Sequence, residues 1–340
     1  MKHIIGGDPP TASAQVKTVV VDEDCDGQRL DNFLIRQLKG VPKTHVYRII
    51  RSGEVRVNKG RAGADTRVET GDMVRIPPVR ISARVSERLD RPAPPREFPV
   101  LLEDDFLLAI DKPAGVAVHG GSGVSFGVIE QLRQARPQAK FLELVHRLDR
   151  ETSGILLVAK KRSALTRLQD QFRERETGKT YLALVSGAWP ANKKVIDLPL
   201  HKYLQADGER RVKVVAADDP EGMRAITIVK VAQRLGLPLP PGAGRGEGHV
   251  FTLLEVTIKT GRTHQIRVHL AAQGHPIAGD DKYGDFELNK ALPKHGLKRM
   301  FLHAWRLRFA HPHTGEEVRL EAALPAELAA FTETLAARPG

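Results

Sequence analysis

The chain has 340 residues, of which 41% are hydrophobic and 28% charged, and it carries a formal net charge of +12. This composition is typical of a globular protein of two or three domains and excludes a predominantly disordered chain. The excess positive charge favours a polyanionic partner such as nucleic acid, although many basic proteins bind none. The single cysteine, Cys25, excludes an internal disulfide and a cysteine-based metal site.

The N-terminal segment lacks the features of a targeting sequence. MKHIIGGDPPTASAQVK contains no apolar stretch of signal-peptide length, and no run of about 18 apolar residues occurs in the chain. We therefore expect a cytoplasmic protein with no membrane partner. Residues 1–20 are polar and interrupted by glycine and proline, which favours a flexible tail.

A small unit is predicted over residues 21–84. Leu30, Phe33 and Leu34 recur at helical spacing, and a second amphipathic helix, PKTHVYRII, is followed by Gly53, which ends it. Short alternating runs then predict strands, the last of them over residues 73–76.

The positive charge of the chain is concentrated in this unit. Between Gly27 and Arg84 there are thirteen Lys or Arg residues and five Asp or Glu residues. Arg48 and Arg51 fall on the helix face opposite the apolar residues. A solvated face is the commoner meaning of charged helix residues, but the concentration of charge favours a phosphate-binding surface.

A proline-rich linker over residues 85–97 precedes a larger domain, predicted over residues 98–330. Strand-like runs such as GILLVAK, KTYLALVSG and FTLLEVTIK mix with helical patterns over residues 126–136, 163–175 and 262–274. Because strands and helices follow no regular βαβ order, the pattern indicates the α+β class. Gly236–Gly248 is dense in glycine and proline, which predicts a surface loop.

The stretch VHRLDRETSGILLVAK places Asp149 between Arg147 and Arg150, directly before an apolar run that predicts a buried strand. A carboxylate at the edge of such a strand is partly shielded from water. A poorly hydrated carboxylate is suited to act as a nucleophile or a base. A structural ion pair with a neighbouring arginine is the commoner use of such an aspartate.

A second dense stretch, KTGRTHQIRVHLAAQGHPIAGDDKYG, carries Arg262, His264, Arg267 and His269. The arginines are suited to hold a phosphate or a carboxylate. The two histidines are five residues apart, which does not place them on one helix face. Hydrogen bonding is therefore favoured over metal binding, and we expect no metal site.

Two further features have a structural and a functional interpretation. Tyr181 opens the strand-like run YLALV, where a half-buried strand tyrosine is the common case and a ring stacked on a base is the alternative. HGGSGVSFG, residues 119–127, is rich in glycine but lacks the ending of a P-loop, so a turn is favoured over a nucleotide site.

Taken in order, HRLDRETSGILLVAK, KTYLALVSG and GRTHQIRVHLAAQGHPIAGDDKYG resemble the characteristic segments of the RluA-type pseudouridine synthases. The small basic unit is similar to the S4-like RNA-binding domain that many of them carry. The resemblance extends from about Gly27 to the end of the chain, apart from the loop over 236–248. It implies a catalytic domain with a mixed, mainly antiparallel sheet and a central cleft, beside a small α/β S4-like domain.

The resemblance also implies an activity and its residues. The reaction is the cofactor-free isomerisation of uridine to pseudouridine in the 23S RNA of the large ribosomal subunit, after the base leaves its stack. Asp149 matches the essential aspartate, which acts as a nucleophile or a base. Arg147 matches an arginine that fills the gap left by the base, Tyr181 a tyrosine that packs on the uracil, and Arg267 an arginine that pairs with the catalytic carboxylate.

Two other functions remain open at this point. One is a non-catalytic RNA-binding factor of ribosome assembly, whose larger domain is inert. The other is a glycosidase with paired carboxylates, for which Glu151 is the only acid close to Asp149 in the sequence. For every one of these functions, the enzyme included, a monomer is the expected state.

Overall fold

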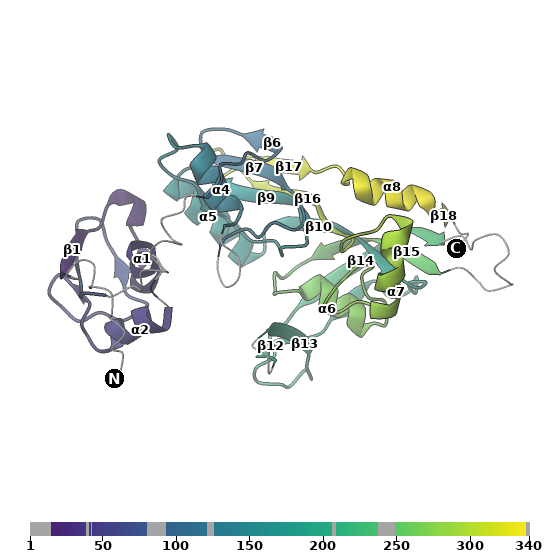
Figure 1. Ribbon diagram of the computed structural model, residues 1–340, viewed down its shortest axis with the longest axis horizontal. Coiled ribbons are helices and arrows are strands. Elements are labelled where there is room, and N and C mark those ends of the chain that lie inside the picture. Colours follow the sequence, from purple (N-terminus) through teal and green to yellow (C-terminus); the bar gives the residue numbers. More distant parts are fainter. Residues whose placement is uncertain are drawn as a thin grey trace, which may run out of the picture. The chain divides into compact units, whose positions relative to one another are not determined.

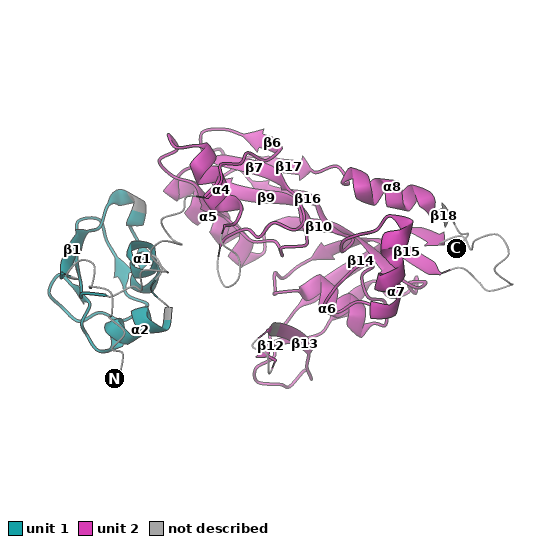
Figure 2. Cartoon of the chain, in the orientation of Figure 1, with its two compact units in different colours: residues 1–92 teal, residues 93–340 magenta. Residues whose placement is uncertain are grey.

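The protein forms two compact units, residues 1–92 and residues 93–340 (Figure 2). The division falls inside the predicted linker. The computed structural model describes residues 15–38, 41, 43–79, 93–120, 126–205, 209–236 and 249–337. The glycine-rich loop predicted over 236–248 lies outside the described residues except for Gly236, as does most of the predicted tail.

The prediction of a flexible tail over residues 1–20 is wrong at its end. Lys17–Val20 form strand β1, which pairs with strand β5, Met73–Ile76, in antiparallel register. Residues 1–20 as a whole are polar and interrupted by glycine and proline, although the segment KTVV at their end is rich in valine. Its backbone hydrogen bonds to a strand more than fifty residues away hold it in the sheet.

The smaller unit packs two helices against short strands. Helices α1 and α2 are Leu30–Gln37 and Lys43–Arg51. The described sheets join β1, β5 and β3 in that order, and β2 with β4. The remaining short elements are β2 (Gln28–Arg29), β3 (Arg56–Val57), β4 (Arg67–Val68) and a 3-10 turn, Glu23–Cys25. The buried core contains the residues that the periodicity predicted, Leu30, Phe33, Leu34, Val46 and Ile49 among them.

The larger unit is built on one mixed sheet, and its described strands run in the order β11-β14-β15-β10-β16-β9-β7-β6 (Figure 1). All its described pairings are antiparallel except that of β9 with β16, which confirms the predicted α+β class and mainly antiparallel sheet. Three short strands pair at its margins and β12 pairs with β13 as a separate hairpin.

The strands of this unit have the following bounds: β6 Val100–Glu103, β7 Leu107–Lys112, β8 Glu143–Leu144, β9 Ser153–Ala159, β10 Gly178–Ser186, β11 Val195–Asp197, β12 Leu200–Leu204, β13 Arg210–Val214, β14 Ile226–Gly236, β15 Val250–Ile258, β16 Leu302–Ala310, β17 Glu317–Glu321 and β18 Ala336–Ala337. Its helices are α4 Val128–Ala135, α5 Arg162–Glu174, α6 Gln265–Ala272, α7 Phe286–Ala291 and α8 Ala326–Thr334, with a 3-10 turn at Leu292–His295.

Strand β9 is buried along its whole length because helices cover both faces of the sheet beside it. Leu157 belongs to the core cluster that contains residues of α5. Leu156 and Val158 belong to the cluster that contains residues of α4. This two-sided burial explains why the sequence of β9 is a continuous apolar run rather than an alternating one.

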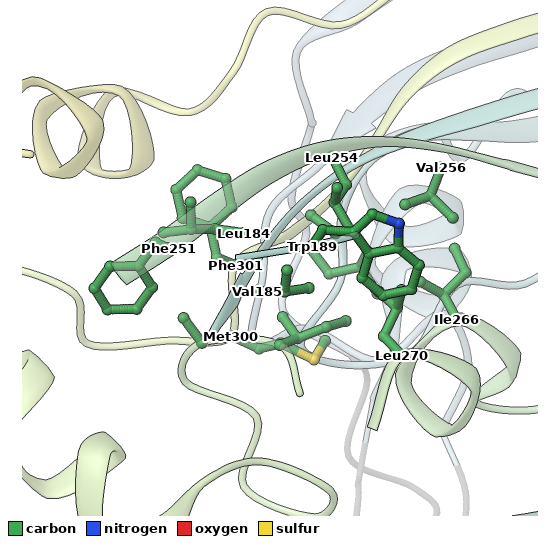
Figure 3. Packing of buried hydrophobic residues seen from close by; sticks show 14 of the residues in the cluster. Leu184, Val185, Trp189, Phe251, Leu254, Val256, Ile266, Leu270, Met300 and Phe301 are labelled. Atoms are coloured by element: carbon green, nitrogen blue, oxygen red, sulfur yellow. The ribbon is translucent and has the colours of Figure 1, made fainter. Parts of the chain in front are cut away.

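Helix α6 is fixed to the sheet by a pair of apolar residues four positions apart. Ile266 and Leu270 lie in the same core cluster as Trp189 and Val256 (Figure 3). Burial of each aliphatic side chain contributes about 2 kcal/mol. The same packing sets the position of Arg267, which follows Ile266 in the helix.

The loop before β9 is anchored where β9 meets β16. Gly154 has φ +111°, and a Cβ there would lie 2.2 Å from the carbonyl oxygen of Ala304, so glycine is required for this close approach. Next to it, the Oγ of Ser153 lies 2.9 Å from Nδ1 of His303 and accepts a hydrogen bond from Arg299 at 2.7 Å. These contacts fix the end of the segment that carries Asp149.

Candidate active site

A hollow of about 110 Å³ lies where the loop before β9, the head of β10 and the N-terminal end of α6 meet. Its lining comes from residues 147–149, Thr152, Tyr181, Ile258 and residues 261–267, with Leu302 of β16. Segments more than a hundred residues apart in the sequence therefore form one site. The pocket contains all four residues that the sequence predicted, Arg147, Asp149, Tyr181 and Arg267.

Asp149 lies in this pocket with its side chain 19% exposed, and it pairs with a distant arginine rather than with its neighbours. Nη1 of Arg267 donates to Oδ2 of Asp149 at 3.4 Å. Arg147 is exposed. Arg150 turns to Gly115, whose carbonyl accepts from its Nε at 2.9 Å. Within the described residues, no ion pair joins Asp149 to either flanking arginine, so the local structural pair considered above is not formed.

Arg267 is buried to 3% exposure of its side chain and is neutralised by Asp280, which is fully buried. Its Nε and Nη2 donate to the two carboxylate oxygens of Asp280 at 2.7 and 2.6 Å. Burial opposes the charged form of Arg267, but the hydrogen bonds and charge of Asp280 outweigh it and raise the pKa of the guanidinium. The fork geometry leaves Nη1 free to face Asp149.

Tyr181 lines the pocket from the first half of β10, where it is half-buried. Burial raises the pKa of its phenol, and the negative charge of Asp149 raises it further. The hydroxyl is therefore protonated at neutral pH. The ring is available for packing and the hydroxyl for donating a hydrogen bond, whereas proton abstraction by a phenolate is disfavoured.

The two histidines of the second stretch make hydrogen bonds, as predicted. Nδ1 of His269 lies 2.9 Å from the hydroxyl of Thr227. Nδ1 of His264 lies 2.9 Å from the hydroxyl of Tyr283. The predicted helix over 262–274 begins only at Gln265, because His264 has φ +52° and stands outside the helical conformation.

Sequence reasoning did not identify Asp280 or Tyr283, or the place of His264 in the pocket. Only the position of these residues in the same dense stretch as Arg267 could have indicated them. Glu151, the second acid of the glycosidase hypothesis, pairs with Arg150 at 3.4 Å and does not line the pocket. Among the described residues, no group of three or more His, Cys, Asp or Glu side chains could hold a metal ion.

The fold is that of a pseudouridine synthase. The RNA pseudouridylate synthase family matches residues 106–272, and the S4 domain family matches residues 28–74. The chain belongs to the RNA pseudouridylate synthase family and is an isomerase. In the described part of the chain, no helix is long and apolar enough to cross a membrane.

Similar proteins cover nearly the whole chain. It is 51% identical over 322 residues to a ribosomal large subunit pseudouridine synthase C of Yersinia pestis, which covers 94% of this chain and 95% of the relative. It is also 51% identical over 318 residues to the protein of that name from Escherichia coli strain K12, with 92% and 94% covered.

Two solved human structures have the same fold as the larger part of the chain. RNA Pseudouridylate Synthase Domain Containing 4 is 26% identical with a TM-score of 0.54, covering 70% of this chain and 94% of that one. RNA Pseudouridylate Synthase Domain Containing 1 has a TM-score of 0.57 at 24% identity, with 73% and 91% covered.

Proposed function

We propose that the protein converts specific uridines of 23S ribosomal RNA to pseudouridine, with Asp149 as the catalytic residue. The observation that carries this proposal is a single carboxylate, partly exposed in a pocket and held at one oxygen by the buried Arg267. The relatives named above, at about half identity over most of their length, support ribosomal RNA of the large subunit as the substrate class.

The isomerisation replaces one bond with another and needs no net change in electrons. The bond between uracil N1 and ribose C1′ breaks, the base turns, and a bond between C5 and C1′ forms. C5 loses a proton and N1 gains one. Asp149 serves this reaction as a nucleophile at the sugar or as a base for a sugar proton.

The other three residues serve the flipped base. Extrusion of a uridine costs a few kcal/mol. Arg147 is exposed at the edge of the pocket, where it can occupy the gap left in the RNA. Tyr181 presents its ring to the uracil, and Arg267 orients the carboxylate.

The smaller unit supplies phosphate contacts. Arg48 and Arg51, with Thr44 and Ser52, line a shallow hollow that extends from the first turn of α2 to the residue after its end. Exposed guanidinium groups on such a surface bind the RNA backbone without reading its sequence. We place the enzyme in the cytoplasm, where it acts as a monomer, and size-exclusion chromatography with light scattering tests that state.

The deciding experiment measures tritium released from 23S ribosomal RNA that carries tritium at uridine C5. Asp149→Asn should bind this RNA normally and release no tritium, whereas the control variant Glu151→Gln should release it at close to the wild-type rate. Undiminished release by Asp149→Asn would contradict the assignment.

The same assay separates the two alternatives. A wild-type protein that binds ribosomal RNA but releases no tritium from any part of it would be a non-catalytic assembly factor. Free uracil among the products would indicate a glycosidase. The pocket disfavours both, because it holds Asp149 and Arg267 in contact and Glu151 does not line it.

A further inference from the structure

The backbone of His264 adopts a conformation that is unfavourable for its residue type. Its φ and ψ are 52° and 19°, in the left-handed region, and its side chain makes no capping hydrogen bond to the helix that follows. Such strain costs about 1–3 kcal/mol and persists where the surrounding structure imposes it, commonly at functional sites. Here the conformation directs the imidazole into the pocket of Asp149.

The hydrogen bonds of Tyr283 indicate one tautomer of His264. The hydroxyl of Tyr283 accepts the backbone N–H of Val212, in β13, at 3.0 Å. The same hydroxyl lies 2.9 Å from Nδ1 of His264. If the phenol uses its one proton in this contact, Nδ1 is the acceptor and the ring proton of a neutral imidazole lies on Nε2.

Burial favours the neutral form of the His264 ring. Burial lowers the pKa of His264; Asp149, in the loop before β9, and Asp280 oppose this shift, and Arg267 of α6 and Lys282 reinforce it. The imidazole is thus a hydrogen-bond donor through Nε2 and not a second cation at neutral pH.

Nε2 of His264 faces the same carboxylate oxygen that Arg267 contacts. It lies 3.9 Å from Oδ2 of Asp149, and Nη1 of Arg267 lies 3.4 Å from that atom. Among the described residues, both contacts to the carboxylate therefore fall on Oδ2. Catalytic hydrogen bonds are often long in the free enzyme and shorten when substrate binds.

We propose that His264 is a positioning residue, which donates from Nε2 to Oδ2 of Asp149 and so leaves Oδ1 to meet the ribose. Tyr283 keeps the required tautomer, and β13 holds Tyr283 through Val212. This inference rests on the proposed catalytic role of Asp149. Asp149 then receives one hydrogen bond from a cationic group, Arg267, and one from a neutral group, His264. The neutral donor orients the carboxylate without adding a second positive charge.

Two substitutions of His264 separate positioning from folding. Asparagine tolerates the left-handed backbone, and its amide can replace Nδ1 toward Tyr283, but it is too short to reach Asp149. Glutamine places its amide nitrogen close to the position of Nε2. His264→Asn should lower the single-turnover rate constant about 10- to 100-fold, the effect expected for one hydrogen bond to a charged group. RNA affinity should change less than about threefold, and His264→Gln should recover most of the rate.

The assay uses tritium release from 23S ribosomal RNA, with wild type and Asp149→Asn measured beside the His264 variants. A wild-type protein without release, or an active Asp149→Asn, refutes the proposed function itself. An active wild type with an inactive Asp149→Asn, together with His264→Asn at wild-type rate, refutes only the positioning role. Equal losses in His264→Asn and His264→Gln would also overturn it, because a merely structural role predicts no rescue.

A second measurement needs no catalysis. In protein with ¹⁵N-labelled histidine, the resonances that disappear in His264→Asn identify His264, and their shifts report which ring nitrogen carries the proton. We expect the Nε2–H tautomer in the wild type and a loss of that preference in Tyr283→Phe. A wild-type His264 protonated on Nδ1 would overturn the inference whatever the activities of the variants.

Discussion

The buried pair of Arg267 and Asp280 should be essential to the larger unit, while the adjacent Asp281 should not. The carboxylate of Asp280 accepts from Nε and Nη2 of Arg267 and from the backbone N–H groups of Lys282 and Tyr283 at 2.8 and 3.1 Å. Asparagine keeps the shape of the side chain but removes its charge. It also turns one oxygen into an N–H group that faces the guanidinium, so a donor meets a donor.

The magnitude follows from burial. Removing one partner of a buried ion pair costs about 3–5 kcal/mol, and asparagine retains one acceptor, so we expect a loss of about 3 kcal/mol for Asp280→Asn. Asp281 contacts Arg267 at 3.2 Å, but its side chain is 66% exposed. Exposed pairs contribute at most about 1 kcal/mol, so Asp281→Asn should be nearly neutral.

Urea unfolding followed by tryptophan fluorescence measures this difference selectively. Both tryptophans of the chain, Trp189 and Trp305, lie in the larger unit, so the signal reports on that unit alone. The midpoint should fall clearly for Asp280→Asn and stay close to wild type for Asp281→Asn. Equal midpoints for the two variants would refute the argument that burial makes the Asp280 pair strong.

Three further outcomes are expected. In the same unfolding assay, Gly154→Ala should lower the free energy of unfolding by about 3 kcal/mol, through backbone strain and a clash with β16. Gly115→Ala, with open space around its Cβ, should lower it by about 1 kcal/mol, and similar losses in the two variants would contradict this explanation. Burial lowers the pKa of His303 to about 4, so the unfolded chain takes up this proton first as pH falls below about 6.5. The free energy of unfolding should therefore decline between pH 6.5 and pH 4, by about 2 kcal/mol at pH 5. If His303→Gln showed the same dependence of this free energy on pH as the wild type, His303 would be excluded as the cause. Replacing Arg48 and Arg51 by glutamine should weaken RNA binding and reduce the slope of log K against log salt concentration by about 1 to 2. Filter binding from about 50 to 200 mM salt measures this slope, and an unchanged slope would exclude the two arginines from the RNA contact.

Local sequence patterns predicted most of the secondary structure and part of the site. The periodicity around Leu30 and Phe33 indicated α1, and the continuous apolar run after Asp149 indicated the buried β9. These features depend on neighbours within a few residues, so they can be read from one segment at a time. The characteristic segments also identified Asp149, Tyr181 and Arg267, which the structure brings to one pocket.

Other features depended on contacts between segments that are distant in sequence. Strand β1 has only four residues and takes its hydrogen bonds from β5, and the polar sequence before it suggested a tail. The sequence placed two arginines beside Asp149, and only the family resemblance indicated Arg267 as its partner. The fold pairs Asp149 with Arg267 and supplies Asp280 as the counter-charge. The sequence by itself determined which residue types were available for catalysis. Only the tertiary structure decided which atoms face each other, because those distances are set by the packing of α6 and β9 on a common sheet.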